Sequence, residues 1–345
     1  MRALTISAHG GLERVEFHDD IETPAVVRPT DVRVRLHAAA LNHLDLWTVG
    51  GLPGITIKPP WILGADGAGV IDAVGDAVTS ARPGDKVFIN GGISDRTCEY
   101  CLAGEQSLCV RFGILGEHLP GTFAEYIVVP EPNVRTIPDD APWDMAAAYP
   151  LVTLTAWRAM ITRARVRAGD RVLIWGVGGG VALAALMICK LLGAHVTVTS
   201  SSDEKLARAR ALGADDTLRH DQVDVGKEMR ARTGKRGVDV VFDSVGEKTW
   251  AQSLIALGKL GRLVTCGGTS GPNLLTDVRR LFWNQWTILG STMGNDTEFD
   301  AITAAFSSGR LKAVVDKVYP LEQGRDALER LEHGAQFGKI VLSIA

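Results

Sequence analysis

A glycine-rich turn between a strand-like run and an apolar helix-like stretch could bind a phosphate. Residues 172–175 lead into Gly176-Val-Gly-Gly-Gly-Val-Ala182, and the helix-like stretch at 183–192 follows. Glycine lets the backbone turn sharply and approach a diphosphate, whose charge the free N–H groups and the helix dipole offset. The pattern predicts a dinucleotide-binding loop, and the alternative is a purely structural turn. The loop residues concerned are Gly176, Gly178, Gly179, Gly180 and Val181.

Three serines stand where the adenosine ribose of a dinucleotide would be bound. The next strand-like run, 195–199, is followed by Ser200, Ser201 and Ser202, and Lys205 comes shortly after. An acidic residue here would accept hydrogen bonds from a ribose 2′-hydroxyl and repel a 2′-phosphate, whereas hydroxyl groups and a lysine suit the phosphate. The pattern therefore favours NADP(H) over NAD(H). The alternative is that the serines only cap the following helix.

Asp95, Cys98, Cys101 and Cys109 form a D-x2-C-x2-C-x7-C pattern within a loop. Three thiolates and one carboxylate can complete a tetrahedron around zinc. Such a closed site would stabilise the loop and take no part in chemistry, because no coordination position is left for a substrate. The alternative is a metal-free loop with reduced thiols. Five cysteines, an odd number, fit a reduced compartment better than a disulfide framework.

Two regions of different pattern must position these residues. From residue 1 to about 150, short β-type runs separated by glycine, proline and aspartate predict a compact β-rich domain. From about 150 to 290, apolar strands alternate with amphipathic helices, which predicts a parallel, doubly wound sheet. Its strands are expected at 171–175, 195–199, 238–242 and 262–266. Helices near 300–308 and 323–332 precede a last strand at 339–343, which we expect to rejoin the first domain.

Length and charge limit the classes of function. A chain of 345 residues is long enough for two domains, and its net charge of -3 gives no basic excess for nucleic acid or anionic membranes. Residues 172–189 are uncharged and largely apolar, but four glycines argue for a buried strand, turn and helix instead of a membrane span. The first residues lack the apolar core of a signal peptide. We therefore expect a cytoplasmic protein that acts on a small molecule.

These segments, together with the motifs at 64–69, 84–88 and 337–342, resemble the medium-chain dehydrogenase/reductase superfamily almost from end to end. Within it, the sequence is similar to the zinc-binding dehydrogenase and quinone oxidoreductase branches. The resemblance implies an α/β protein with a GroES-like, β-rich catalytic domain at 1–151 and 291–345. A doubly wound Rossmann cofactor domain would occupy 152–290, with the active site in the cleft. The resemblance also implies a homodimer or homotetramer with 287–290 as an edge strand, and the alternative is a buried strand without a dimer.

The resemblance assigns a catalytic zinc to two cysteines and a histidine, but those three places hold Asn42, Ala65 and Leu151. Asparagine is a poor zinc ligand, alanine and leucine cannot ligate, and Asp66 cannot hold a metal alone. Leu44 stands at the place of the family's proton-relay hydroxyl. We therefore expect no catalytic zinc. Without a Lewis acid, the acceptor has to delocalise its own charge, as quinones and α,β-unsaturated carbonyls do.

The expected function is thus NADPH-dependent reduction of a quinone or an α,β-unsaturated carbonyl. The alternatives are an alcohol or aldehyde dehydrogenase of the zinc-binding-dehydrogenase family and a non-catalytic NADPH-binding protein. Asn42, His43 and Asp45 follow a strand-like segment and are the candidate catalytic residues. Asn42 could donate a hydrogen bond to a developing oxyanion and Asp45 could orient its neighbours, while by resemblance His43 lies near the diphosphate; local capping and packing are the alternatives. The resemblance also assigns cofactor contacts to Thr155, Ser244, Val245, Gly267, Ser291, Met293 and Lys339.

Overall fold

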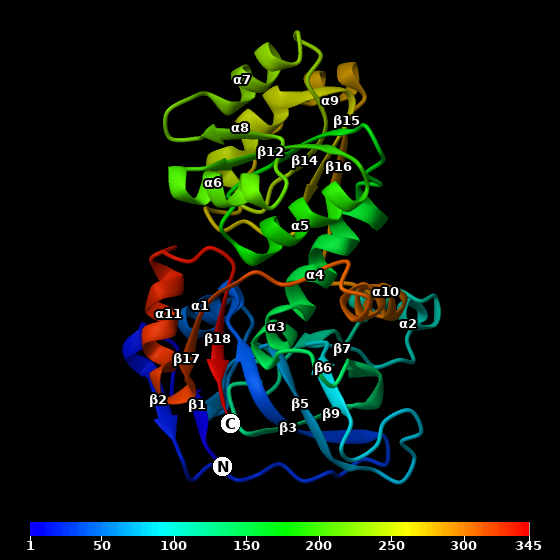
Figure 1. The fold of residues 1–345 in the computed structure, drawn as a ribbon, viewed down its shortest axis with the longest axis vertical. Coiled ribbons are helices and arrows are strands. Elements are labelled where there is room, and N and C mark those ends of the chain that lie inside the picture. The colour runs from blue at the N-terminus through cyan, green and yellow to red at the C-terminus, as the bar shows by residue number, and fades with distance from the viewer. Residues whose placement is uncertain (345) are drawn as a thin grey trace. The chain divides into compact units, whose positions relative to one another are not determined.

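The computed structural model describes residues 1–344, and the chain divides into two compact units, each described here by itself (Figure 1). Unit 1 comprises Met1–Val152 and Gly294–Ala345, and unit 2 comprises Thr153–Met293. The sequence-based boundaries, after 151 and after 290, fall next to these. Within residues 1–344, no helix combines the length and the apolar composition needed to cross a membrane.

Unit 1 is a β-rich domain. Its strands are β1 (Ala3–Ile6), β2 (Val15–His18), β3 (Asp31–Ala40), β4 (Trp61–Ile62), β5 (Asp66–Val74), β6 (Lys86–Ile89), β7 (Gly92–Ile93), β8 (Gly113–Ile114), β9 (Tyr126–Pro130), β10 (Val134–Thr136), β17 (Val315–Pro320) and β18 (Lys339–Ser343). The largest sheet has the order β10-β6-β5-β3-β18-β17, and β9 also pairs with β3. Strand β18 runs antiparallel to β3, so the last strand joins unit 1 as predicted. The sequence analysis missed β17, which pairs with β18.

Strand β3 shows why these residues form a sheet that faces a core. Its side chains Val32, Val34 and Leu36 alternate along the strand and are fully buried, as the period of two requires. The helices of this unit are α1 (His43–Gly50), α2 (Glu99–Leu102), α3 (Trp143–Ala148), α10 (Asp296–Ser307) and α11 (Gly324–Glu332), and α4 (Pro150–Trp157) leads into unit 2. Short 3-10 helices lie at Leu12–Arg14, Gln106–Leu108, Glu131–Asn133 and Leu321–Gln323.

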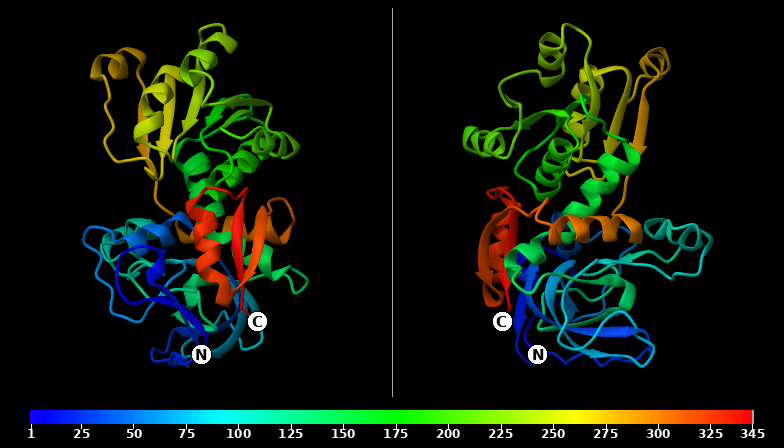
Figure 2. Two further views of the ribbon diagram at one scale, coloured as in Figure 1. Left: turned by 90° about the vertical axis from the view of Figure 1, so that its left-hand side faces the viewer. Right: turned by 45° about the vertical axis from the view of Figure 1, so that its right-hand side comes forward.

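Unit 2 is a doubly wound α/β domain. Its parallel strands are β11 (Arg171–Ile174), β12 (His195–Ser200), β13 (Asp216–Arg219), β14 (Val238–Phe242), β15 (Leu257–Thr265) and β16 (Thr287–Gly290). The order is β13-β12-β11-β14-β15-β16, so the strand order reverses between β11 and β14, where such sheets bind their ligands. Helices flank the sheet (Figure 2), namely α5 (Gly180–Leu191), α6 (Asp203–Ala211), α7 (Val225–Arg232), α8 (Glu247–Ala256) and α9 (Val278–Asn284), with a π-helical segment at Arg158–Arg163.

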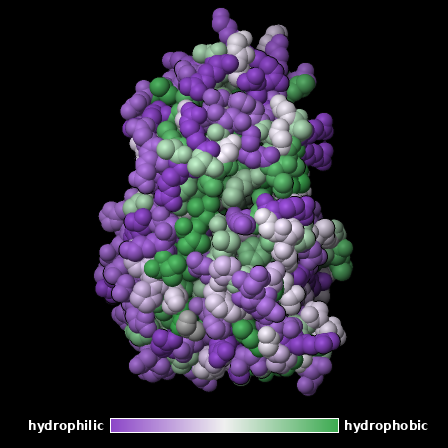
Figure 3. All heavy atoms as spheres, viewed as in Figure 1, coloured by the Kyte–Doolittle hydropathy of each residue, from purple (hydrophilic) through white to green (hydrophobic). Residues whose placement is uncertain are grey.

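The surface is mainly polar on the face that Figure 3 displays, where hydrophilic side chains predominate over both units and apolar side chains form smaller groups. The apolar side chains gather inside each unit instead. In unit 1 the core includes Leu36, Leu63 and Phe123, and in unit 2 it includes Leu173, Val241 and Trp250. The large sheet of each unit is therefore held in place by an apolar core, which makes it a rigid support for the residues at its strand ends.

Candidate functional site

The glycine loop lies at the carboxyl end of β11, where the strand order of unit 2 reverses. Gly176 has a φ of +69° and Gly178 a φ of +151°, which L side chains rarely adopt. Gly179 caps the N-terminus of α5, and a Cβ placed there would meet no heavy atom of the described residues within 4 Å. Open space above a helix N-terminus with free N–H groups is what a diphosphate requires. The loop therefore fits a dinucleotide.

The turn after β14 lies next to this loop and is shaped by Asp243. The buried carboxylate of Asp243 accepts hydrogen bonds from the N–H groups of Val245 and Gly246, both at 3.0 Å, and from two hydroxyl groups of α8 at 2.8 and 2.6 Å. The Val245 side chain lies 3.7 Å from the point where a Cβ of Gly176 would stand. The structure thus places Val245 beside the glycine loop, and Ser244 precedes it in the same turn.

Four further predicted cofactor residues belong to unit 2, namely Thr155, Gly267, Ser291 and Met293. The Thr155 hydroxyl lies 3.7 Å from the Met293 sulfur, so these two residues are in contact. The Ser291 N–H donates to the Thr265 carbonyl at 2.9 Å, but the Ser291 hydroxyl is buried and has no hydrogen-bond partner within residues 1–344. The same holds for the hydroxyl groups of Thr48, Ser94 and Ser107, so a cofactor contact of Ser291 stays a prediction. Gly267 lies in the turn after β15, where its carbonyl accepts from the Thr265 hydroxyl at 2.9 Å.

The serines stand at the end of β12, as predicted, and two of them also shape the backbone there. The Ser200 hydroxyl accepts from the Ser202 N–H at 3.1 Å, and the Ser202 hydroxyl accepts from the Lys205 N–H at 3.3 Å. The helix-capping role that the sequence offered as an alternative is therefore present. Ser201 is exposed. No acidic side chain occupies the last position of β12, which is Ser200.

Arg219 is a residue of this region that the sequence analysis missed. The parallel register of β12 and β13 places it opposite Ser200. Its guanidinium donates to Asp203 at 2.6 Å and to Asp221 at 2.9 and 2.7 Å. A cation therefore lies on the strand next to the serines, although two carboxylates balance its charge. Only the pairing of β13 with β12 reveals this neighbour, because the two residues are well separated along the chain.

A buried cluster of polar side chains in unit 1 contains two of the three candidate catalytic residues. This polar cluster consists of Asn42, Asp45, Asp66 and Lys339, whose exposed fractions are 7, 1, 0 and 3%. The Lys339 ammonium donates to Asn42 Oδ1 at 2.5 Å and to Asp66 Oδ2 at 2.9 Å. The Asn42 amide donates to the same carboxylate oxygen at 2.9 Å, and the Leu151 N–H donates to the other at 2.9 Å. The cluster is thus a closed network around one ammonium and one carboxylate.

Asn42 and Asp45 also begin helix α1. Asp45 Oδ2 accepts from the Asn42 backbone N–H at 2.7 Å, which is the local capping that the sequence offered as an alternative. Burial raises the pKa of Asp45 to about 7, against the opposing effects of the Asn42 N–H and the Lys339 charge. The second amide hydrogen of Asn42 is directed at the Ala40 carbonyl, 3.4 Å away. An Asn42 hydrogen bond to an oxyanion therefore stays a prediction that requires one of these contacts to open.

The structure shows the surroundings of His43 and Lys339, the remaining candidates in unit 1. His43 is the first residue of α1, is exposed, and meets the Trp47 ring edge-on at 5.1 Å between centroids. It is therefore not a member of the polar cluster. Lys339, which the resemblance assigned to the cofactor, directs its ammonium to Asn42 and Asp66. Its contact with the cofactor stays a prediction.

The polar cluster does not fit a catalytic zinc. Ala65 and Leu151 offer no side-chain ligand atom, and both are apolar. The remaining oxygen atoms that could bind a metal are those of the Asn42 amide and the Asp66 carboxylate. Both residues already accept a hydrogen bond from the Lys339 ammonium. A metal would have to displace this buried cation. Its ligands would then all be oxygen atoms, which zinc sites rarely use alone.

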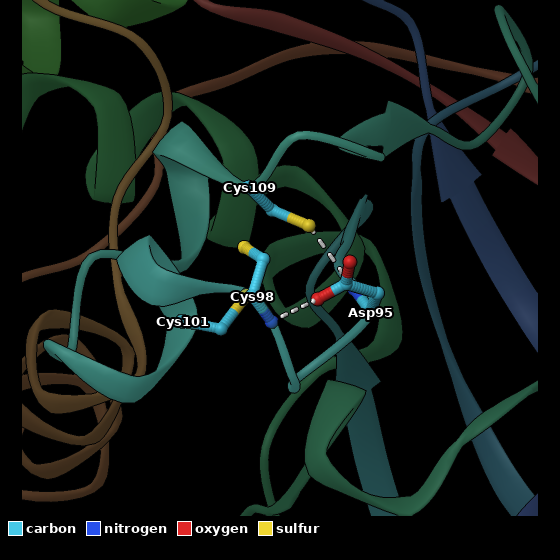
Figure 4. Close-up of side chains that lie close together, drawn as sticks. All are labelled: Asp95, Cys98, Cys101 and Cys109. Carbon is cyan, nitrogen blue, oxygen red and sulfur yellow. Dashed lines mark hydrogen bonds between the residues drawn. The ribbon is translucent and has the colours of Figure 1, made fainter.

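The cysteine lobe brings its four predicted residues together. One ligand atom from each of Asp95, Cys98, Cys101 and Cys109 lies within 4.8 Å of all the others, and Figure 4 shows the side chains converging. The Asp95 carboxylate accepts from the N–H groups of Thr97 and Cys98 at 2.9 and 3.0 Å, and the Asp95 N–H donates to the Cys109 sulfur at 3.2 Å. Three sulfurs and one oxygen, held in a preformed loop, fit tetrahedral zinc.

Comparison with known proteins agrees with this architecture. Residues 28–139 match the model of the alcohol dehydrogenase GroES-like domain, and residues 180–308 match that of the zinc-binding dehydrogenases. A zinc-type alcohol dehydrogenase-like protein of Schizosaccharomyces pombe is 33% identical, with 94% of each chain covered. The quinone oxidoreductase of Homo sapiens is 28% identical, with 99% of this chain and 97% of that protein covered.

A solved structure of an NAD-dependent alcohol dehydrogenase is 44% identical, with a TM-score of 0.95 over 100% of both chains. The matches cover both units, and the GroES-like and zinc-binding-dehydrogenase models together span more than half of the chain. The chain therefore belongs to the medium-chain dehydrogenase/reductase superfamily, a family of nicotinamide-dependent oxidoreductases.

Proposed function

We propose that the protein reduces quinones or α,β-unsaturated carbonyl compounds with NADPH and without a catalytic metal. The observation that carries this proposal is the polar cluster, in which the Lys339 ammonium already occupies the oxygen acceptors of Asn42 and Asp66. NADPH supplies the hydride when it is bound. Hydride addition to a quinone or an enone leaves an anion that is delocalised over the acceptor, so the protein need not concentrate a metal charge on one oxygen.

The choice of NADPH rests on the residues around the end of β12. Ser200 stands where an acidic residue would favour a ribose 2′-hydroxyl, and Lys205 and Arg219 add positive charge nearby. Hydroxyl groups and cations together provide the donors that a 2′-phosphate needs. Because Arg219 also bonds to Asp203 and Asp221, a phosphate has to compete with these carboxylates. We therefore expect a preference for NADPH and not an absolute one.

The second candidate function is an alcohol or aldehyde dehydrogenase. It is favoured by the 44% identity to a protein whose structure is described as an NAD-dependent alcohol dehydrogenase. Such an enzyme would have to stabilise a localised alkoxide, for which the described residues offer no metal site in unit 1 apart from the cysteine lobe. The quinone oxidoreductase relative supports the first candidate in the same way.

Product analysis separates these two candidates. An α,β-unsaturated aldehyde such as cinnamaldehyde contains both a C=C and a C=O bond, so a single incubation with NADPH reports which bond accepts the hydride. The proposal predicts the saturated aldehyde as the first product. Formation of the unsaturated alcohol, with the C=C bond intact, would favour the dehydrogenase and contradict the proposal.

We further propose that the cysteine lobe holds one structural zinc ion. Asp95, Cys98, Cys101 and Cys109 provide four donors, so a bound ion would have no open position and would act on stability alone. Burial raises the pKa of Cys101 to about 12, so this thiol becomes a ligand only if the metal displaces its proton. Zinc uptake should therefore release protons.

We also propose a homodimer formed through the edge of the unit 2 sheet. Strand β16 is the last strand of that sheet and is largely exposed, so its free edge can pair with a second copy. Helix α9 precedes it and carries Val278, Phe282 and Trp283, which are 64, 63 and 76% exposed. Large apolar side chains beside a free edge are typical of an interface between identical subunits.

A further inference from the structure

The Lys339 ammonium occupies a place that the fold builds for it. Lysine is almost never buried unless it is paired, and Lys339 is 3% exposed with two oxygen acceptors in contact. The preceding residue, Gly338, has a φ of +112°, and a Cβ there would lie 2.2 Å from the Val314 carbonyl oxygen. The Lys339 N–H donates to the same carbonyl at 2.8 Å. Only glycine allows the backbone to enter β18 in this way.

The acceptors of this ammonium come from segments that are far apart in the sequence. Asn42 follows β3 and precedes α1, and Asp66 is the first residue of β5, opposite Ala40 in the β3–β5 register. The second oxygen of Asp66 is taken by the N–H of Leu151 on α4. One ion pair therefore fixes the start of α1, the start of β5, the start of β18 and the backbone of α4.

We propose that Lys339 is a positioning residue: its ammonium is the permanent cation of the polar cluster, and in place of a metal it holds the Asn42 amide and the Asp66 carboxylate in the arrangement that turnover requires. This inference rests on the proposed function. It accounts for the two features that a purely cofactor-binding lysine would leave unexplained, namely its burial and its contact with Asn42.

The charge of the Lys339 ammonium also affects the ionisation of Asp45. Lys339 on β18 favours the ionised form of Asp45, and Asp66 on β5 disfavours it. The basic groups of α11, which packs against α1, are engaged elsewhere: Arg325 with the carbonyls of Val15 and Glu13, and Arg330 with Asp316. Removing Lys339 and removing Asp66 should therefore move the titration of Asp45 in opposite directions.

The test compares Lys339→Met, Asp66→Asn, the double variant and Lys339→Arg with the unchanged protein. The Asp45 carboxyl is followed by carbon-13 NMR between about pH 5 and 11, with its signal assigned by its loss in Asp45→Asn. The NADPH dissociation constant and the pH profile of kcat/KM for the acceptor are measured on the same samples. The double variant removes both charges of the Lys339–Asp66 pair, so neither partner is left buried without the other, and it keeps the test available if a single variant does not fold.

We expect Lys339→Met to raise the pKa of Asp45 by about 1 to 3 and Asp66→Asn to lower it, with the double variant near the unchanged protein. Lys339→Met should lower kcat at least about tenfold and shift the pH profile upward, with the NADPH dissociation constant within about twofold. Lys339→Arg should restore part of the rate because it keeps the charge.

Two results would overturn the inference. A weaker NADPH affinity with an unmoved Asp45 titration would make Lys339 a ligand of the cofactor phosphates. A moved titration with an unmoved kcat and pH profile would make the cluster purely structural. If the unchanged protein turns over no quinone or enone, the proposed function fails, whereas the NMR titration still decides whether Lys339 sets the charge of the cluster.

Discussion

Replacement of Asp45 by asparagine should make the stability of the protein less dependent on pH. Burial raises the pKa of this carboxyl from 3.8 to about 7 in the folded protein. A raised folded-state pKa means that the group supports the fold at low pH and that this support is lost as the pH rises from about 4 to about 7. A difference of about 3 in pKa, at about 1.4 kcal/mol each, corresponds to about 4 kcal/mol.

The measurement is urea unfolding at a series of pH values from 5 to 8. Between pH 5 and about 7, the Asp45 carboxyl is protonated in the folded protein and ionised in the unfolded protein. Over these two pH units the free energy of unfolding should fall by about 3 kcal/mol. Asparagine does not ionise, and in Asp45→Asn its oxygen can still accept from the Asn42 N–H. The free energy of unfolding of the variant should therefore not fall over this pH interval. The free energies of the two proteins should diverge by about 3 kcal/mol, with the variant the more stable at pH 8.

The matched control is Asp76→Asn, because Asp76 is an exposed carboxylate in the same unit. Its free energy of unfolding should run parallel to that of the unchanged protein over the whole pH range. If the Asp45→Asn curve also runs parallel, Asp45 titrates alike in the folded and unfolded states. The assignment of Asp45 to a charge-sensitive buried cluster would then be refuted.

The other predictions concern the cofactor, the metal and the subunit interface. Ser200→Asp should lower kcat/KM for NADPH relative to NADH by at least about tenfold, because a carboxylate repels the 2′-phosphate; an unchanged ratio in paired kinetic assays would place the phosphate elsewhere. Cys101→Ser should abolish stoichiometric zinc in elemental analysis and lower the thermal midpoint of unfolding by about 5 °C or more. Retention of the full zinc content would contradict zinc binding by the cysteine lobe. Trp283→Asp should produce monomers in sedimentation experiments, whereas an unchanged mass would exclude a subunit interface formed by α9 and β16.

Sequence patterns predicted the local parts of the fold because their signals are local. The glycine loop lies between β11 and α5, and the serines lie at the end of β12. Both positions could be predicted because hydrophobic runs and turn residues mark the ends of strands directly. The division of the chain followed from the change of pattern near residue 150. Strand β17 was missed because half of the residues of Val315–Pro320 are exposed and the segment carries no continuous apolar run.

The polar cluster could not be predicted in the same way. Asn42 and Lys339 are 297 positions apart, and their contact depends on the antiparallel pairing of β18 with β3. Sequence reasoning recognised both residues but gave them separate roles, one near the substrate and one near the cofactor. Arg219 was missed for a similar reason, because only the register of β13 against β12 brings it to Ser200. Long-range pairing thus determines which residues lie in contact with one another.

The most direct test of the account is NADPH oxidation against a panel of quinones, enones, simple ketones and aldehydes, before and after removal of metal by a strong chelator. Metal-independent hydride transfer predicts turnover of quinones or enones that is insensitive to the chelator as long as the protein stays folded, which circular dichroism would monitor. Turnover confined to simple aldehydes or ketones, and abolished by the chelator without unfolding, would contradict the metal-independent mechanism.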